Sequence, residues 1–178
     1  MYGFNRIGIS AYASVVALLL ALAAWPSAAG ARECQPVDEA AIKQLFVRWN
    51  AALQLPQPDW DHPNPAAVVN LYAREAVLLP TVENGPYTNP DAIGKYFEHF
   101  LKKQPSGVID EATRTIRIGC NMAFDAGLYT FTYARCPQPP EPTDPNCAPT
   151  KARYTYVYKY YDDGGWLIAH HHSSKQPK

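Results

Sequence analysis

Near its C-terminal end the chain alternates between two kinds of side chain. In residues 151–161, every second position from 154 to 160 is a tyrosine, and the alternate positions carry Arg153, Thr155, Val157 and Lys159. Successive side chains of a β-strand point to opposite faces, so this pattern predicts a long strand with one aromatic and one mixed face. An Asp-Gly turn then leads into residues 165–174. We therefore expect a β-hairpin at the centre of a sheet.

Earlier segments have the spacing of amphipathic helices. Residues 37–53 place apolar side chains along one stripe, which predicts a helix with one buried face. Asn-Pro pairs at 64–65 and 89–90 are typical of helix starts, because Asn caps the first turn and Pro suits its first position. We expect a short helix after the first pair and a longer one, ending at residue 103, after the second.

Short strands account for most of the remaining chain. Strands are predicted at 76–80, at about 112–119 and at about 127–134. The resulting order is helix, helix, strand, helix and then four strands, which favours an α+β fold with N-terminal helices packed on one face of a mostly antiparallel sheet. No internal repeat or linker is present, so we expect a single domain over residues 32–178 with a proline-rich insertion at 136–147.

The first 31 residues have the pattern of a secretory signal peptide. Residues 7–25 are mostly Ala, Leu, Val and Ile, they follow the basic Arg6, and small residues at 27–31 offer cleavage sites. We expect a bacterial, periplasmic or secreted protein with no membrane attachment after cleavage. The alternative is an uncleaved membrane anchor, which the short apolar run disfavours.

The charge balance argues against one class of partner. Lys and Arg number 16 and so do Asp and Glu, and residues 1–31 contain one charged residue, Arg6, so cleavage gives 15 − 16 = −1. A nucleic-acid-binding protein usually carries a basic block or stripe, and this chain has none. We therefore expect no nucleic-acid partner.

Four cysteines lie beyond the predicted signal peptide: Cys34, Cys120, Cys136 and Cys147. An even number in an oxidising compartment favours disulfides, and four cysteines allow three pairings. We favour Cys136–Cys147, because this pair brackets a proline-rich loop that gains from a covalent link, and Cys34–Cys120 then remains. No C-x-x-C spacing exists, so zinc is disfavoured, and we expect no metal and no other cofactor.

The order of elements resembles the nuclear transport factor 2-like fold, in which a curved sheet wraps over helices to form a cone. Residues 163–174 resemble the last hairpin strand of the association (hub) domain of calcium/calmodulin-dependent protein kinase II. Residues 96–101 resemble that family's third helix, and Asp125-Ala126 with the following strand resembles its central hairpin. SnoaL-like and SgcJ/EcaC proteins share this pattern. The resemblance covers about residues 37–177 and does not imply kinase activity, because no kinase or calmodulin-binding segment is present.

Relatives keep a pocket at the open end of the cone, so the resemblance implies a ligand site there. Arg153 is the first candidate, because a half-buried arginine needs a carboxylate or an anionic ligand. The hub domain's best-matched pocket arginine aligns with Val157, four residues away on the same face. The alternative is an internal salt bridge between Arg153 and Glu75 or Glu83.

Other side chains complete the predicted ligand site. His170 and His172 point the same way on a strand, so they could act as an acid or a base but supply at most two metal ligands. Ketosteroid-isomerase-like relatives combine a pocket Asp or His with tyrosines. That resemblance suggests Tyr72, Tyr129 and Glu83 as further ligand-binding groups.

The resemblance also implies self-association. If Arg153 faces the cone, the tyrosines of residues 151–161 lie on the outer side of the sheet, and an exposed aromatic face of that size needs a partner. Relatives dimerise through this sheet surface, and the hub domain builds rings from such dimers. The alternative is that the proline-rich insertion covers the face. The predicted interface residues are Tyr154, Tyr156, Tyr158, Phe131 and Tyr133.

The chain contains no nucleophile motif, P-loop or dinucleotide fingerprint. We therefore expect a secreted homodimer or larger ring that binds a small molecule, with an anion as the candidate class, and that has no chemistry of its own. The alternative is a small SnoaL-like or ketosteroid-isomerase-like enzyme acting by general acid/base chemistry. A third hypothesis is a structural partner of another envelope protein.

Overall fold

The computed structural model describes residues 3, 33–81, 83–135 and 147–177. The predicted signal peptide and residues 136–146 of the predicted insertion therefore lie outside the described part, apart from residue 3. The helices are α1 (Glu39–Leu53), α2 (Ala66–Val69) and α3 (Pro90–Leu101). The strands are β1 (Tyr72–Leu79), β2 (Pro105–Ile109), β3 (Thr115–Gly119), β4 (Met122–Tyr133), β5 (Thr150–Tyr161) and β6 (Gly165–Lys175).

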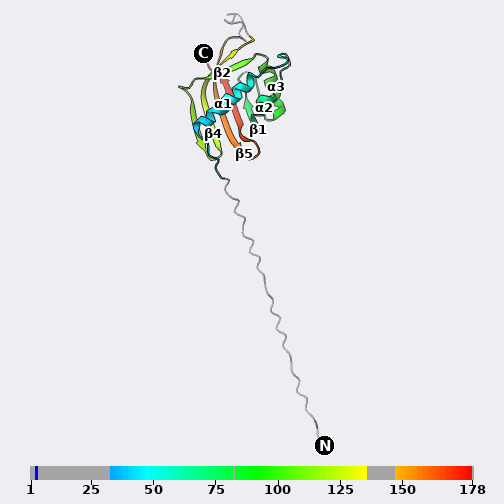
Figure 1. The fold of residues 1–178 in the computed structure, drawn as a ribbon, viewed down its shortest axis with the longest axis vertical. Helices are drawn as coiled ribbons and strands as arrows, with labels where there is room; N and C mark the ends of the chain where they lie inside the picture. Colours follow the sequence, from blue (N-terminus) through cyan, green and yellow to red (C-terminus); the bar gives the residue numbers. More distant parts are fainter. Residues whose placement is uncertain (1–2, 4–32, 82, 136–146, 178) are drawn as a thin grey trace. The chain divides into compact units, whose positions relative to one another are not determined.

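The strands form one sheet in the order β1-β6-β5-β4-β2, and β3 also pairs with β4. The β1–β6 pair is parallel and the other pairs are antiparallel. Helix α1 lies across one face of this sheet, and α2 and α3 lie on the side of β1 (Figure 1). The predicted α+β architecture and the central hairpin β5–β6 are confirmed.

Strand β2 was not among the predicted strands. Residues 104–107 contain Pro105 and Gly107, which are typical of turns, yet Pro105 begins β2. This strand lies at the sheet edge, where a missing backbone N–H is tolerated. Gly107 also has a packing reason, because a Cβ there would lie 3.0 Å from the Phe131 ring.

Capping side chains define where the two longer helices begin. The Asp38 carboxylate accepts from the Ala41 backbone N–H at 2.7 Å, and Asn89 accepts in the same way from Ala92 at 2.9 Å. Pro90 occupies the first turn of α3, as predicted. These caps satisfy backbone donors that lack partners within the helix.

The tyrosines of β5 form the inner face of the sheet, under α1. Tyr154, Tyr156 and Tyr158 are all buried. The Tyr156 ring lies 5.5 Å from the Trp49 ring and 6.1 Å from the Phe46 ring, and both of these residues belong to α1. The prediction that this aromatic face is the outer side of the sheet is wrong.

This finding corrects the predicted interface as a whole. Strand alternation shows which side chains share a face, but it does not show which face the helices cover. The stripe of α1 is itself aromatic, and burying tyrosines against it removes more apolar area from water than burying a face that carries Arg and Lys. The predicted interface residues are therefore core residues: Tyr154, Tyr156, Tyr158, Phe131 and Tyr133.

A β-bulge in β6 decides which histidine faces inward. Val157 pairs with His170, but Tyr158 pairs with Ile168, so one residue of β6 between them has no partner in β5. Beyond the bulge, His171 pairs with Tyr156 and shares its inner face, and His170 and His172 lie on the outer face. An uninterrupted strand would have placed these two on the inner face instead.

A buried ion pair lies on the inner face beside Tyr154. Asp125 is fully buried and accepts from Arg114 Nε at 3.1 Å and from Arg114 Nη2 at 2.6 Å. The Tyr154 hydroxyl donates to the same carboxylate at 2.9 Å. Arg114 also contacts Glu111, whose side chain is 59% exposed. The burial of Asp125 is thus compensated by charge-assisted hydrogen bonds.

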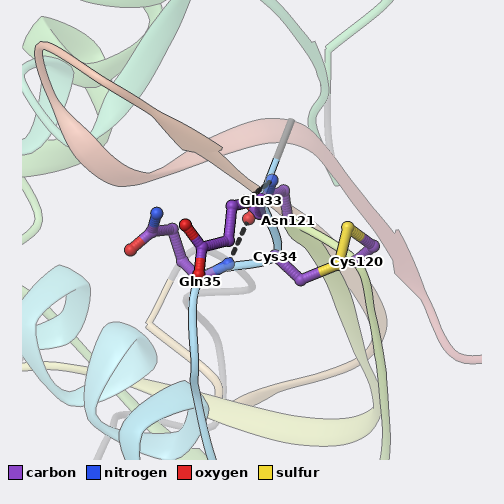
Figure 2. The surroundings of a disulfide bond; sticks show 5 residues. All are labelled: Glu33, Cys34, Gln35, Cys120 and Asn121. Atoms are coloured by element: carbon purple, nitrogen blue, oxygen red, sulfur yellow. Dashed lines mark hydrogen bonds between the residues drawn. A yellow bond between two sulfur atoms is a disulfide. The ribbon is translucent and has the colours of Figure 1, made fainter. Parts of the chain in front are cut away.

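The predicted Cys34–Cys120 disulfide is present, and it joins the segment before α1 to the end of β3 (Figure 2). Asn121 strengthens this connection: its side-chain amide donates to the Glu33 carbonyl at 2.9 Å and accepts from the Gln35 N–H at 2.7 Å. Asn121 has φ 56°, a left-handed conformation that asparagine tolerates well. The other predicted disulfide, Cys136–Cys147, involves a residue outside the described part of the chain.

Replacing Asp125 by Asn should destabilise the protein strongly, because the buried Arg114 would lose its buried counter-charge and keep only the exposed Glu111. We expect the free energy of unfolding in urea to fall by about 3 kcal/mol. The control is Glu111→Gln, which removes the exposed partner of the same arginine and should cost less than about 1 kcal/mol. Equal losses in the two variants would contradict the role assigned to Asp125.

Candidate functional site

A cavity of about 270 Å³ lies between the helices and the inner face of the sheet. Its innermost lining residues, among them Trp49 and Phe97, are fully buried, and the exposed Lys175 and the half-buried Lys103 mark its opening. Most of its apolar wall is aromatic and comes from α1, α3 and β4. These residues are Trp49, Tyr96, Phe97, Phe100, Tyr129, Phe131 and Tyr133.

One side of the cavity carries hydroxyl groups that bond to one another. Tyr129 donates to Ser173 Oγ at 2.5 Å, and the Ser173 and Thr81 hydroxyls are hydrogen-bonded. Burial raises the pKa of Tyr129 well above its ordinary value, so this phenol stays protonated. The three groups provide a polar patch without a charge.

A second polar group, His171, lies on the inner face and is 3% exposed. Its Nδ1 lies 2.8 Å from the Tyr72 hydroxyl, which in turn accepts from Trp49 Nε1–H at 3.0 Å. The imidazole stacks on the Tyr156 ring with 4.1 Å between centroids. Its Nε2 has no hydrogen-bond partner among the described residues.

Burial sets the protonation state of His171. Removal from water disfavours the charged imidazolium, and the neighbouring His170 and His172 act in the same direction, so the pKa of His171 falls to about 3. The ring is therefore neutral at pH 7, and one of its two nitrogens carries a proton.

Two of the predicted site residues lie at or near the cavity. Tyr129 lines it, and Tyr72 lies next to it, bonded to His171. Glu83 is not among the described lining residues; it accepts from the Tyr87 hydroxyl. Tyr72 and Tyr129 are thus brought to one side of the sheet, and Glu83 lies beside Tyr87, whose ring packs against Tyr96 of the cavity wall.

The remaining predicted site residues lie on the outer face. Arg153 is exposed and its Nε donates to Ser174 Oγ at 3.2 Å, so it occupies neither the cone nor the predicted salt bridge. The carboxylate of Glu75 accepts from Tyr161 instead, at 2.6 Å. His170 and His172 lie on the same outer face as Arg153. The placement of Arg153, His170 and His172 in the cone was therefore wrong.

The residues that sequence reasoning missed are His171, Ser173, Lys103 and Lys175. The first two could not be assigned because the bulge in β6 changes which residues face inward. One signal was available in the sequence: Phe46 and Trp49 on the helix stripe predict an aromatic partner surface, and the tyrosines of β5 are the best match.

The described residues lack two kinds of feature. They contain no group of three or more His, Cys, Asp or Glu side chains that could hold a metal ion. They also contain no helix with the length and apolar character needed to cross a membrane.

The protonation state of His171 predicts a pH dependence of stability. Between about pH 6.5 and pH 3 the unfolded chain binds a proton at this residue that the folded chain does not, so stability falls as the pH falls. From pH 7 to pH 5, His171 should contribute a loss of about 2 kcal/mol.

The measurement is the free energy of unfolding in urea at pH 7 and pH 5. His171→Phe should remove this part of the pH dependence, and His172→Phe, on the outer face, should retain it. An identical pH dependence in wild type and His171→Phe would show that His171 is not held neutral.

Comparison with known proteins agrees with this fold. The family model "Calcium/calmodulin dependent protein kinase II association domain" matches residues 38–177. A Xanthomonas campestris structure named for the same domain is 41% identical, with a TM-score of 0.63, and the match covers 82% of this chain and 96% of that one. No curated protein matches the chain.

More distant structures share the fold. A nuclear transport factor 2-like protein from Pseudomonas putida is 19% identical, with a TM-score of 0.57, and the match covers 79% of this chain and 87% of that one. A Streptomyces avermitilis protein, named as a dehydratase of the same fold family, is 9% identical with a TM-score of 0.59 and coverages of 77% and 94%. The resemblance and the cone fold predicted from sequence are both confirmed. The chain belongs to the calcium/calmodulin-dependent protein kinase II association domain family, within the nuclear transport factor 2-like fold.

Proposed function

We propose that the protein is an exported, self-associating binding domain that holds a small aromatic molecule in its cavity. The aromatic wall supports this class of ligand, because flat rings pack well against Trp, Tyr and Phe side chains. The proposal that the protein is exported rests on the signal-peptide pattern of its N-terminal sequence. A disulfide at Cys34–Cys120 is compatible with an extracytoplasmic location.

The observation that favours binding over catalysis is the protonation state of the side chains that line the cavity. A general base works best with a pKa near the working pH. The described lining residues include no carboxylate, the pKa of His171 is about 3, and burial raises the pKa of Tyr129 and Tyr96. The inner wall therefore offers hydrogen bonds but no strong proton acceptor.

Two lysines favour an anionic group on the ligand. Lys175 is exposed at the opening, and Lys103 Nζ lies 5.6 Å from the centre of the Tyr133 ring, which also lines the cavity. An aromatic acid could thus bury its ring and keep its carboxylate near these ammonium groups. The lysines replace Arg153, which lies on the outer face, as the candidate anion-binding groups.

We expect the aromatic anion 2-naphthoate to bind with one molecule per chain, measured by calorimetry or by its fluorescence. The double variant Lys103→Met/Lys175→Met should bind it about 5-fold more weakly at low salt, because partly exposed charges contribute modestly and are screened. The control Lys159→Met changes a lysine of β5 outside the described lining and should bind like wild type. No binding to wild type would contradict the proposed function.

The outer face of the sheet is the candidate surface for self-association. It exposes apolar side chains on neighbouring strands: Phe124 is 38% exposed and Met122 50%, and with Val157 they line a shallow groove. Val108 on β2 is 66% exposed on the same side. Exposed apolar side chains of this kind favour burial against a partner, and the family is one of association domains.

The mature protein should be a dimer or a larger ring in solution, by light scattering after size exclusion. Phe124→Glu places a charge in the apolar groove and should yield folded monomers. The control Val47→Glu alters an apolar side chain of α1 that is 50% exposed, and it should leave the mass unchanged. A monomeric wild-type protein would contradict self-association.

One observation favours the alternative of a small enzyme. The cavity contains a buried histidine held by a tyrosine and a tryptophan, and one protein with this fold is named as a dehydratase. A neutral imidazole could polarise a substrate carbonyl as a hydrogen-bond donor. Such an enzyme would still need a proton acceptor carried by its substrate, since the described lining lacks one.

A further inference from the structure

A row of directly paired residues crosses the outer face of the sheet. Each member is the register partner of the next one on the neighbouring strand, from β1 through β6, β5 and β4 to β3. In this order the members are Val77, His170, Val157, Phe124 and Arg117. Side chains paired in this way share one face and lie about 5 Å apart. His170 therefore lies between two valines, next to the groove that Val157 and Phe124 line.

A second row runs beside the first, two residues away on each strand. Its members, in the same strand order, are Leu79, His172, Thr155, Ala126 and Thr115. Apart from Arg117 on β3, the two histidines are the only titratable side chains in these two rows. The middle of the outer face is thus apolar or neutral when both imidazoles are neutral.

The charged groups around the two rows are mostly basic. Lys151, Arg153 and Lys159 of β5 share the outer face with the histidines, and Arg117 lies at its β3 edge. The acidic side chain of β1, Glu75, is engaged in a hydrogen bond with a tyrosine of β5. A proton on either histidine therefore adds positive charge to a basic surface, and the rows contain no carboxylate to compensate it.

The structure already disfavours the charged form of one of these imidazoles. Burial lowers the pKa of His170 below its ordinary value, and the neighbouring His172 acts in the same direction. A second copy packed over the two rows would remove more water from both rings. Because desolvation disfavours an imidazolium, both rings would then stay neutral at pH values where the free chain binds protons.

We propose that protonation of His170 and His172 controls self-association through the outer face. The neutral rings pack against apolar side chains of a second copy, and protonation releases the copies as the pH falls below about 6. The direction follows from linkage, because the free chain binds more protons than the assembly and acid therefore favours the free chain. This inference rests on the proposed self-association and specifies its regulation.

The dissociation constant of the assembly at pH 7.5 and pH 5.5 tests the proposal, by sedimentation or light scattering. A histidine of ordinary pKa that must be neutral in the assembly weakens association about tenfold over this range. With two such residues in each chain, we expect wild-type association to weaken at least about 100-fold.

Two double variants show which histidines are responsible. The dissociation constant of His170→Gln/His172→Gln should change less than about fivefold between the two pH values, because both titrating groups are gone. The matched control is His62→Gln/His99→Gln, which replaces two exposed histidines outside the sheet and should keep the wild-type pH dependence.

The outcomes separate the inference from the proposed function. A wild-type protein that is monomeric at both pH values would overturn self-association and its regulation together. Equal dissociation constants at both pH values would overturn the regulation alone. Acid-induced dissociation that persists in His170→Gln/His172→Gln would also overturn it, because His171 or partial unfolding would then be the cause.

Proton uptake can be measured on the wild type alone, even if the double variant fails to fold. Dilution of the assembly at pH 6 releases free chains, whose exposed histidines take protons from the buffer. The heats of dilution in two buffers of different ionisation enthalpy give the number of protons, which we expect to be about one or more per chain. Dissociation without proton uptake would contradict the proposal.

Discussion

The packing of α1 on the tyrosines of β5 is the interaction on which the other features depend. Between ring centroids, Phe46 lies 6.4 Å from Tyr154 and 6.1 Å from Tyr156, and Trp49 lies 5.5 Å from Tyr156. Aromatic side chains bury large areas and prefer tilted or edge contacts of this kind. Once α1 covers this face, the opposite face of the sheet must remain open to solvent or to a partner.

The same contact shapes the cavity. The helices meet the sheet through large rings, and rings from α1, α3 and β4 continue beyond the contact to line a space that ends at two lysines. The bulge in β6 then turns His171 toward α1, where Tyr72 and Trp49 hold it. A single extra residue in one strand thereby determines which histidine of three becomes part of the interior.

Local features of the fold could be predicted from sequence, because they follow from nearby residues. The Asn89-Pro90 start of α3, the Asp-Gly hairpin and the alternation of β5 depend on neighbours in the chain. The orientation of the tyrosine face depends on a contact between α1 and β5, more than 100 residues apart, and could have been inferred from Trp49 and Phe46. The inward position of His171 could not have been inferred, because nothing in the sequence around it indicates the bulge. Because the tyrosine face of β5 is the inner one, Arg153 lies on the outer face. Because of the bulge, His170 and His172 lie on the outer face as well.

We propose that the inner face holds a ligand and that the outer face holds a second copy of the chain. The most direct measurement is a crystal structure of the mature protein grown with 2-naphthoate. We expect the naphthalene ring to lie among Trp49, Phe97 and Tyr129, and a neighbouring copy to pack over Phe124. An empty cavity with naphthoate bound elsewhere, or a solvent-exposed Phe124 in a crystal whose copies meet through other surfaces, would contradict it.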